Sequence, residues 1–205
     1  STFIKAIVNE FKYEGTIKLG HNVQLGYFAQ NQAEYLDGEI TLLQTMEDAA
    51  MDTNRSKVRD MLGSFLFRGD DVEKKVKVLS GGERNRLALC KLLLQPINVL
   101  LMDEPFGALD AQTRIMMQES LLNIWSEFGI TVLFVTHDVD EAIFLADRVL
   151  VMSASPGSVI ADLKVDLERP RKPEMATSDG FVELKKQCLG HIRAESLKAF
   201  EQVGA

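Results

Sequence analysis

A short apolar run followed by two carboxylates, within residues 98–110 (NVLLMDEPFGALD), constrains this chain more than any other stretch. Residues 99–102 are apolar without alternation, which is typical of a parallel strand buried on both faces. Asp103 and Glu104 follow at once, and Pro105 prevents the strand from continuing in a ladder. Open α/β sheets bind ligands at such strand ends, where these carboxylates would suit a hydrated Mg²⁺ and a catalytic water. The same residues also fit a strand that simply ends in a charged turn.

Three further segments accompany this strand in a fixed order. LSGGE occupies residues 79–83, ALD occupies residues 108–110, and VTHD at residues 135–138 ends a second apolar run. Together with LLMDEP, they resemble the signature motif, D-loop, switch histidine and Walker B motif of the ABC ATPase nucleotide-binding domains. The resemblance implies an α/β fold of the P-loop NTPase class, with a mainly parallel sheet and a small helical subdomain.

The same resemblance implies that the chain binds ATP and Mg²⁺ and hydrolyses ATP. Asp103 would bind the metal, and Glu104 would polarise the attacking water. His137 would contact the γ-phosphate, and Asp110 would belong to the nucleotide site as the end of the D-loop. These roles come from the family and are expectations for this chain.

The signature segment predicts a second subunit. Ser80, Gly81 and Gly82 open a helix, and two glycines at a helix N-terminus let free backbone N–H groups approach an anion closely. The resemblance implies that this anion is the γ-phosphate of ATP bound to a second ABC ATPase subunit. The active form would then be a head-to-tail dimer.

The first residues resemble the end of a phosphate-binding loop, G-x-x-x-x-G-K-[ST]. We therefore expect the chain to be truncated within the Walker A motif, with Ser1 as a Mg²⁺ ligand and Thr2 beside the nucleotide. An ordinary N-capped helix is the alternative. Gln30 takes the place of the family's glutamine that touches Mg²⁺ and water.

Local patterns divide the rest of the chain. A hairpin is expected from residues 15–19 and 23–28 around a turn at 20–22, because short β-type runs flank a turn-like cluster. The predicted domains are a partial nucleotide-binding core, a helical subdomain, the remaining core, and a linker with a C-terminal helix, covering residues 1–30, 31–78, 79–166 and 167–205. Predicted elements within them are helices at 41–50, 54–67, 80–94, 111–128 and 138–146, strands at 131–135, 148–152 and 159–165, and a linker at 168–180.

Composition limits the classes of partner. The net charge of −7 argues against binding the phosphate backbone of nucleic acid, so direct DNA binding is not expected. No apolar run approaches the roughly 20 residues that cross a bilayer. Cys90 and Cys188 form neither a disulfide framework nor a metal-ligand spacing. We expect a cytoplasmic protein that reaches the plasma membrane's inner face only through a permease.

The two halves resemble different branches of the family. Residues 1–104 are similar to ABC-F proteins, which act on ribosomes, whereas the sequence from Phe106 onward is similar to ATP-binding subunits of nitrate, sulfonate and taurine importers. Three functions remain open: an importer ATPase subunit with a membrane permease, a fragment of a ribosome-associated ABC-F factor, and a non-catalytic fragment without the P-loop lysine. The segment that would meet a permease, residues 30–78, lies in the ABC-F-like half.

Overall fold

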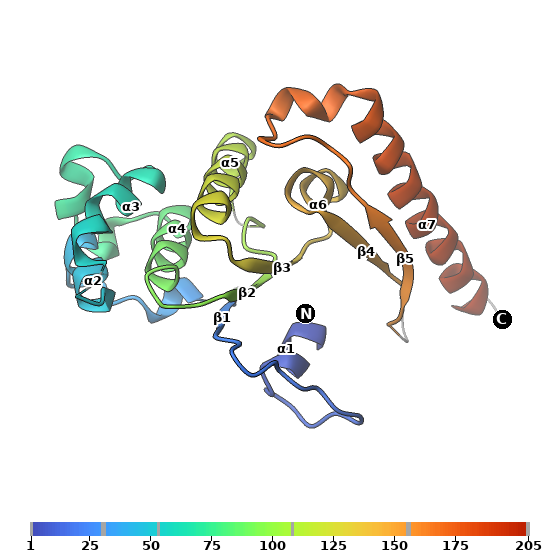
Figure 1. Cartoon of the computed structure of the whole chain (residues 1–205), viewed down its shortest axis with the longest axis horizontal. Coiled ribbons are helices and arrows are strands. Elements are labelled where there is room, and N and C mark those ends of the chain that lie inside the picture. Colours follow the sequence, from blue (N-terminus) through green and yellow to red (C-terminus); the bar gives the residue numbers. More distant parts are fainter. Residues whose placement is uncertain (1, 30–31, 53, 108, 155–156, 204–205) are drawn as a thin grey trace. The chain divides into compact units, whose positions relative to one another are not determined.

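The computed structural model describes residues 2–29, 32–52, 54–107, 109–154 and 157–203, the last five without their side chains. The chain forms two compact units, Ser1–Val135 and Thr136–Ala205, and each is described by itself (Figure 1). The boundary falls within the predicted segment 79–166, so the division into domains that the sequence suggested stays a prediction. Ser1 and Gln30, the two further expected Mg²⁺ contacts, lie outside the described residues.

The first unit is organised around a parallel sheet of three strands in the order β1-β2-β3. β2 (Val99–Asp103) lies between β1 (Leu25–Phe28) and β3 (Thr131–Val135) and pairs in parallel with both. Residues 100–103 of β2 are all buried. The prediction of a buried parallel strand ending in Asp103 is therefore confirmed.

The predicted hairpin before β1 is wrong. Residues 15–19 form no strand, and β1 pairs with β2 instead of with a preceding segment. The amide of Asn98 explains the difference, because its Oδ1 accepts from the Gln24 N–H at 2.8 Å and its Nδ2 donates to the Asn22 carbonyl at 2.7 Å. These bonds attach the segment to the start of β2. The expected turn is present, with the Val23 N–H donating to the Gly20 carbonyl.

Helices α1 (Thr2–Ile7), α4 (Gly81–Leu92) and α5 (Ala111–Phe128) belong to the same unit. The ends of α5 agree with the prediction, since Asp110 caps its start and Gly129, at φ 59°, ends it in the left-handed conformation. Ile115 and Met116 on α5 are exposed. The buried apolar side chains of this helix are those of Met117, Leu121 and Ile124.

A small helical group occupies residues 32–78. Its main helices are α2 (Leu42–Ala49) and α3 (Val58–Ser64), and α2 packs on both α3 and α4. Thr41 caps α2, and its side chain accepts from the Gln44 N–H. The helix predicted over residues 54–67 is shorter, because Leu66 adopts a positive φ of 67° just after α3. Four short 3₁₀ segments complete the group: η1 (Gln32–Tyr35), η2 (Arg55–Lys57), η3 (Gly69–Glu73) and η4 (Val76–Val78).

The second unit is a two-stranded antiparallel sheet with helices. Its elements are α6 (Val139–Leu145), β4 (Arg148–Met152), β5 (Val159–Lys164), η5 (Pro173–Thr177) and α7 (Asp179–Val203). α7 packs on α6 and on both strands, as Figure 1 shows. None of the helices in the described part of the chain combines the length and the apolar composition needed to span a membrane.

The linker predicted at residues 168–180 is a packed segment. Arg171 is buried there, and η5 contacts both α6 and α7. Proline and charged residues suggested an exposed connection, but the guanidinium of Arg171 binds the backbone of α6 and holds the segment down.

Candidate functional site

The carboxylate pair lies where β2 ends. Asp103 is 8% exposed, and Glu104, the next residue, is less deeply buried. Glu104 has a φ of 47°, a left-handed conformation that is uncommon for a residue other than glycine. Its N–H donates to the Val135 carbonyl at 2.9 Å, which ties the residue to the end of β3. Strained backbone of this kind occurs at functional sites where the surrounding structure maintains it.

The loop after Glu104 is anchored to the sheet. The ring of Phe106 is buried and lies 5.7 Å, centroid to centroid, from the ring of Phe134 on β3. The Gly107 N–H donates to the Glu104 carbonyl at 3.2 Å. These contacts hold Glu104 and the loop that follows it against the C-terminal end of β3.

Asp110 has a structural role in this chain. Its Oδ1 accepts from the Thr113 N–H at 3.0 Å and so caps α5. Hydrogen bonds from Thr113 lower the pKa of the Asp110 carboxyl. The cap accounts for this aspartate without a nucleotide, and its contact with nucleotide stays a prediction.

The start of α4 is closed by a reciprocal pair of hydrogen bonds. The Ser80 N–H donates to Glu83 Oε2 at 2.8 Å, and the Glu83 N–H donates to Ser80 Oγ at 3.2 Å. The Ser80 N–H bond is also the main reason that the pKa of Glu83 is lowered. The sequence contains the S-x-x-E pattern of this capping box, so Glu83 could have been recognised as a positioning residue.

The two signature glycines have different surroundings. A Cβ on Gly82 would lie 3.0 Å from Leu109 Cδ2, so packing against the D-loop explains a small residue there. A Cβ on Gly81 would meet nothing within 4 Å. Neither neighbouring atoms nor a positive φ explains why residue 81 is glycine. Close approach of a group outside this chain would explain it, because that group would need the space of a side chain.

His137 belongs to the second unit, whereas Asp103, Glu104 and the signature segment belong to the first. His137 is exposed and lies between two residues of one tight turn. The Asp138 N–H donates to Thr136 Oγ1 at 3.0 Å, and Asp138 Oδ1 accepts from the N–H groups of Asp140 and Glu141. Asp138 thereby caps α6.

The residues fit Mg²⁺ bound together with ATP. A buried carboxylate at a strand end supplies the hard oxygen that Mg²⁺ prefers, and Mg²⁺ usually takes its other ligands from phosphates and water. Within the described residues, no three His, Cys, Asp or Glu side chains cluster closely enough to hold a metal ion by themselves. Thr2, the first residue of α1, is exposed and available to a phosphate group.

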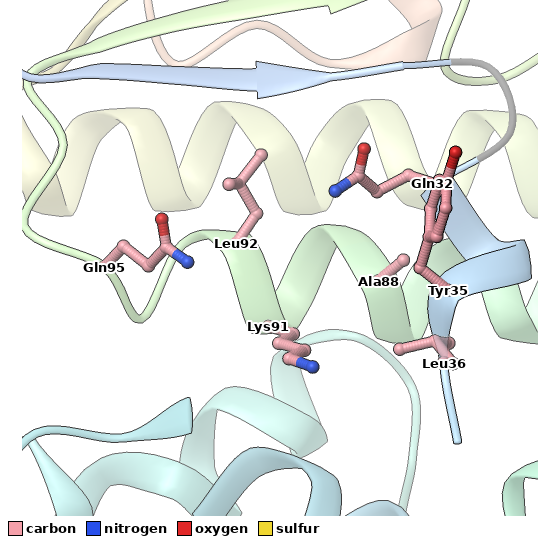
Figure 2. A pocket seen from close by; sticks show the side chains of 7 residues that line it. All are labelled: Gln32, Tyr35, Leu36, Ala88, Lys91, Leu92 and Gln95. Carbon is pink, nitrogen blue, oxygen red and sulfur yellow. The ribbon is translucent and has the colours of Figure 1, made fainter. Parts of the chain in front are cut away.

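A separate cavity of about 80 Å³ lies between η1 and the C-terminal half of α4 (Figure 2). Typical small-molecule pockets occupy about 300–1,000 Å³, so this cavity accommodates a side chain and not a nucleotide. Its lining combines apolar and polar side chains, which are Gln32, Tyr35, Leu36, Ala88, Lys91, Leu92 and Gln95.

Comparison with known proteins agrees with this geometry. A family model described as "ABC transporter" matches residues 1–107, slightly more than half of the chain. This chain belongs to the ABC transporter family. An aliphatic sulfonates import ATP-binding protein of Bacillus cereus is 48% identical over 125 residues, and an uncharacterized ABC transporter ATP-binding protein of Methanocaldococcus jannaschii is 48% identical over 123 residues. Each match covers 60% of this chain, with 49% and 45% of the relatives, respectively.

Solved structures show the same fold. A dimeric ATP-binding cassette in a post-hydrolysis state with ADP and Pi matches with a TM-score of 0.57 at 25% identity, over 71% of this chain and 65% of that chain. An archaeal ribosome recycling factor in complex with a ribosomal stalk protein matches with a TM-score of 0.58 at 21% identity, over 80% and 29%. The chain is thus an ABC-type ATPase domain that spans about half the length of its curated relatives.

Proposed function

We propose that this chain is part of an ABC-type subunit that hydrolyses ATP to energise uptake of a small anion of the nitrate, sulfonate or taurine type. The observation that carries the proposal is the Asp103–Glu104 pair at the end of the central strand β2. Similarity to the sulfonate import ATP-binding protein supports the anion class.

The reaction is in-line attack of water on the γ-phosphate, with bound Mg²⁺ supplying positive charge to the phosphates. Asp103 would hold the metal at the sheet edge. Glu104 would orient the water and accept its proton, and the His137 side chain would contact the γ-phosphate. Each of these side chains would thus act on a metal ion, a water or a phosphate that other residues of the site also help to position.

A second copy of the subunit would complete the site. The open surroundings of Gly81 and the exposed start of α4 support contact with a γ-phosphate held by that copy. The dimeric state of the matching ATP-binding cassette supports the same arrangement.

A permease would bind beside the helical group. The first residues that line the cavity between η1 and α4 come shortly after Gln30 in the sequence. Among them is Tyr35, which is 74% exposed. An apolar groove that receives a helix depends on a few anchoring side chains, among which tyrosine is frequent. Tyr35 is therefore the side chain in this region best suited to contact a permease helix.

The test is ATP hydrolysis in proteoliposomes, using a protein in which G-x-x-x-x-G-K precedes Ser1, so that Ser1 completes the phosphate-binding loop. We expect a sulfonate-type permease with loaded binding protein to raise the rate, and Tyr35→Ala to reduce that rise while leaving basal hydrolysis unchanged. Phe128→Ala is the matched control, since Phe128 is an exposed aromatic residue, at 43%, that does not line the cavity. Basal hydrolysis that no permease of this type stimulates would refute the importer role.

The ribosome is the second candidate partner, because residues 1–104 resemble ABC-F proteins. The same protein is therefore also assayed with ribosomes. Stimulation by ribosomes and not by the permease would favour an ABC-F role, whereas the residues of the hydrolytic site would keep the functions proposed above.

A further inference from the structure

Arg171 is a buried cation at the C-terminal end of α6. Its side chain is 1% exposed. The Nη1 group donates to three backbone carbonyls, those of Ile143 at 3.1 Å, Phe144 at 3.0 Å and Ala146 at 2.7 Å. The last carbonyls of a helix have no partner within the helix, so this guanidinium satisfies groups that α6 itself leaves unbonded.

Other charged side chains also lie at the C-terminal end of α6. Arg169 Nη2 donates to the Leu145 carbonyl at 3.1 Å and lies 2.7 Å from Asp147 Oδ1. Burial, together with the charge of Arg169, lowers the pKa of Arg171 to about 10, so Arg171 is still a cation at neutral pH. Positive charge is favourable at a helix C-terminus because the helix dipole is negative there.

α6 needs an anchor of this kind. The helix has seven residues, and isolated helices shorter than about 12–15 residues are marginal in water. The ion pair of Asp140 on α6 with Lys185 on α7 is half-exposed at both partners, and exposed pairs contribute little. Buried Ile143 adds apolar packing.

Packing alone does not account for an arginine here. The Nε of Arg171 is buried and has no hydrogen-bond partner in the described structure, so the residue carries a desolvation cost that an apolar side chain would avoid. What an apolar side chain could not do is bind three carbonyls at once. The residue type therefore indicates a requirement for fixed helix geometry.

The opposite end of α6 carries the turn with His137. Asp138 caps the helix, its carbonyl accepts from the Ala142 N–H at 3.1 Å, and its own N–H is bonded to Thr136. The Ala146 N–H in turn donates to the Ala142 carbonyl at 3.0 Å. A continuous chain of hydrogen bonds thus runs from Arg171 to the two residues that flank His137.

We propose that Arg171 is a positioning residue for ATP hydrolysis, which closes the C-terminal end of α6 and thereby fixes the turn that carries His137. This inference rests on the proposed function of the chain. Among the described residues, the polar partners of Arg171 are backbone carbonyls and the Asp147 carboxylate, so its effect on the reaction would pass through α6.

Arg171→Met and Arg171→Lys test the proposal, with Arg148→Met as the control. Arg148 is an exposed arginine in the same unit that pairs with Asp162 on β5. In residues 1–205, amide hydrogen exchange of α6 is expected to accelerate about tenfold to a hundredfold in Arg171→Met, the range for a net loss of about one charged hydrogen bond. Arg171→Lys is expected to show a smaller acceleration, and Arg148→Met none.

Kinetics in the protein with a complete phosphate-binding loop separate positioning from general stability. We expect kcat to fall about tenfold in Arg171→Met, equivalent to about 1.4 kcal/mol of transition-state stabilisation, with the KM for ATP nearly unchanged. Arg171→Lys should recover part of kcat because it keeps the charge and one or two of the bonds.

Unchanged exchange in α6, or unchanged kcat despite faster exchange, would overturn the proposal. If Arg171→Met fails to fold, as judged by circular dichroism, Arg171→Lys decides in the same way. A parent protein that binds but never hydrolyses ATP would instead refute the proposed function, and the exchange experiment would still show whether Arg171 holds α6.

Discussion

Two helices in this molecule follow residues predicted to contact the γ-phosphate, and they are held in different ways. α4 has 12 residues, closes its own start through Ser80 and Glu83, and buries one apolar side. α6 has seven residues, and its C-terminal carbonyls bind Arg169 and Arg171, which follow 24–28 residues later in the chain. The start of the first helix is closed by near neighbours, whereas the C-terminal end of the second is closed by a distant segment.

The difference shows how the end of a short helix can be fixed by a segment far along the chain. A helix as short as α6 gains little from its own hydrogen bonds, so its geometry depends on tertiary contacts. α4 is longer and carries its capping residues within one turn of its start. Substitutions should therefore act locally at α4 and at a distance at α6.

Each helix start is predicted to serve hydrolysis at a Glu104, the start of α6 in its own subunit and the start of α4 in the second copy. Glu104→Gln tests this premise with the largest expected effect. Loss of the general base should lower hydrolysis by about 10²-fold or more, because glutamine cannot accept the proton from water. Steady-state ATPase assays on the protein with a complete phosphate-binding loop measure it. ATP binding and the melting temperature should be retained, since glutamine has nearly the same shape. Near-normal turnover would remove Glu104 from this role.

Gly81→Ala tests whether the start of α4 contacts the phosphate of a nucleotide bound to a second copy. Alanine at an open helix position should leave the folded chain as stable or slightly more stable, whereas the added methyl group would meet the phosphate of a partner-bound nucleotide. We expect hydrolysis to fall at least about tenfold, a loss of about 1.4 kcal/mol.

Gly63→Ala is the control for this substitution. Gly63 lies within α3, also with open space where its Cβ would be, and has no predicted contact with nucleotide. Hydrolysis that is equal in Gly81→Ala and Gly63→Ala would exclude a ligand at the signature glycine. A melting temperature lowered only in Gly81→Ala would indicate a packing role instead.

Ser80→Ala gives the smallest expected effect and measures how local the start of α4 is. Removing the cap should lower the free energy of unfolding by about 1 kcal/mol. Urea unfolding of residues 1–205 measures the change, and Thr41→Ala, which removes the cap of α2, is the comparison variant. A loss several times larger in Ser80→Ala than in Thr41→Ala would contradict the view that α4 is closed by near neighbours alone.

Much of the fold could be predicted because its signals are local. The uninterrupted apolar run before Asp103 predicted the central strand, and the bounds predicted for the helix at residues 111–128 agree with α5. The hairpin before β1 could not be predicted in this way. Its β-type residues were recognisable, but the amide of Asn98, more than 70 residues away, decides what the segment contacts.

The candidate site also combines features that local motifs predicted with features that depend on contacts between distant residues. The order of the motifs predicted Asp103, Glu104 and His137 as residues of the nucleotide site, and the signature segment as a contact of the nucleotide bound to a second subunit. The sequence contained no sign that Gly82 packs against Leu109, although both belong to recognised motifs. An Arg-Pro-Arg run at residues 169–171 was visible but resembled an exposed linker.

By itself, the sequence determined the family, the parallel strand that ends in the carboxylate pair, and the bounds of α5, because such signals act over a few neighbouring residues. Only the tertiary structure decided the left-handed backbone of Glu104 beside Val135 and the burial of Arg171 against α6. Such contacts join residues that are far apart in the chain. Their energy depends on which surfaces meet after folding, and no local pattern of residue types encodes that pairing.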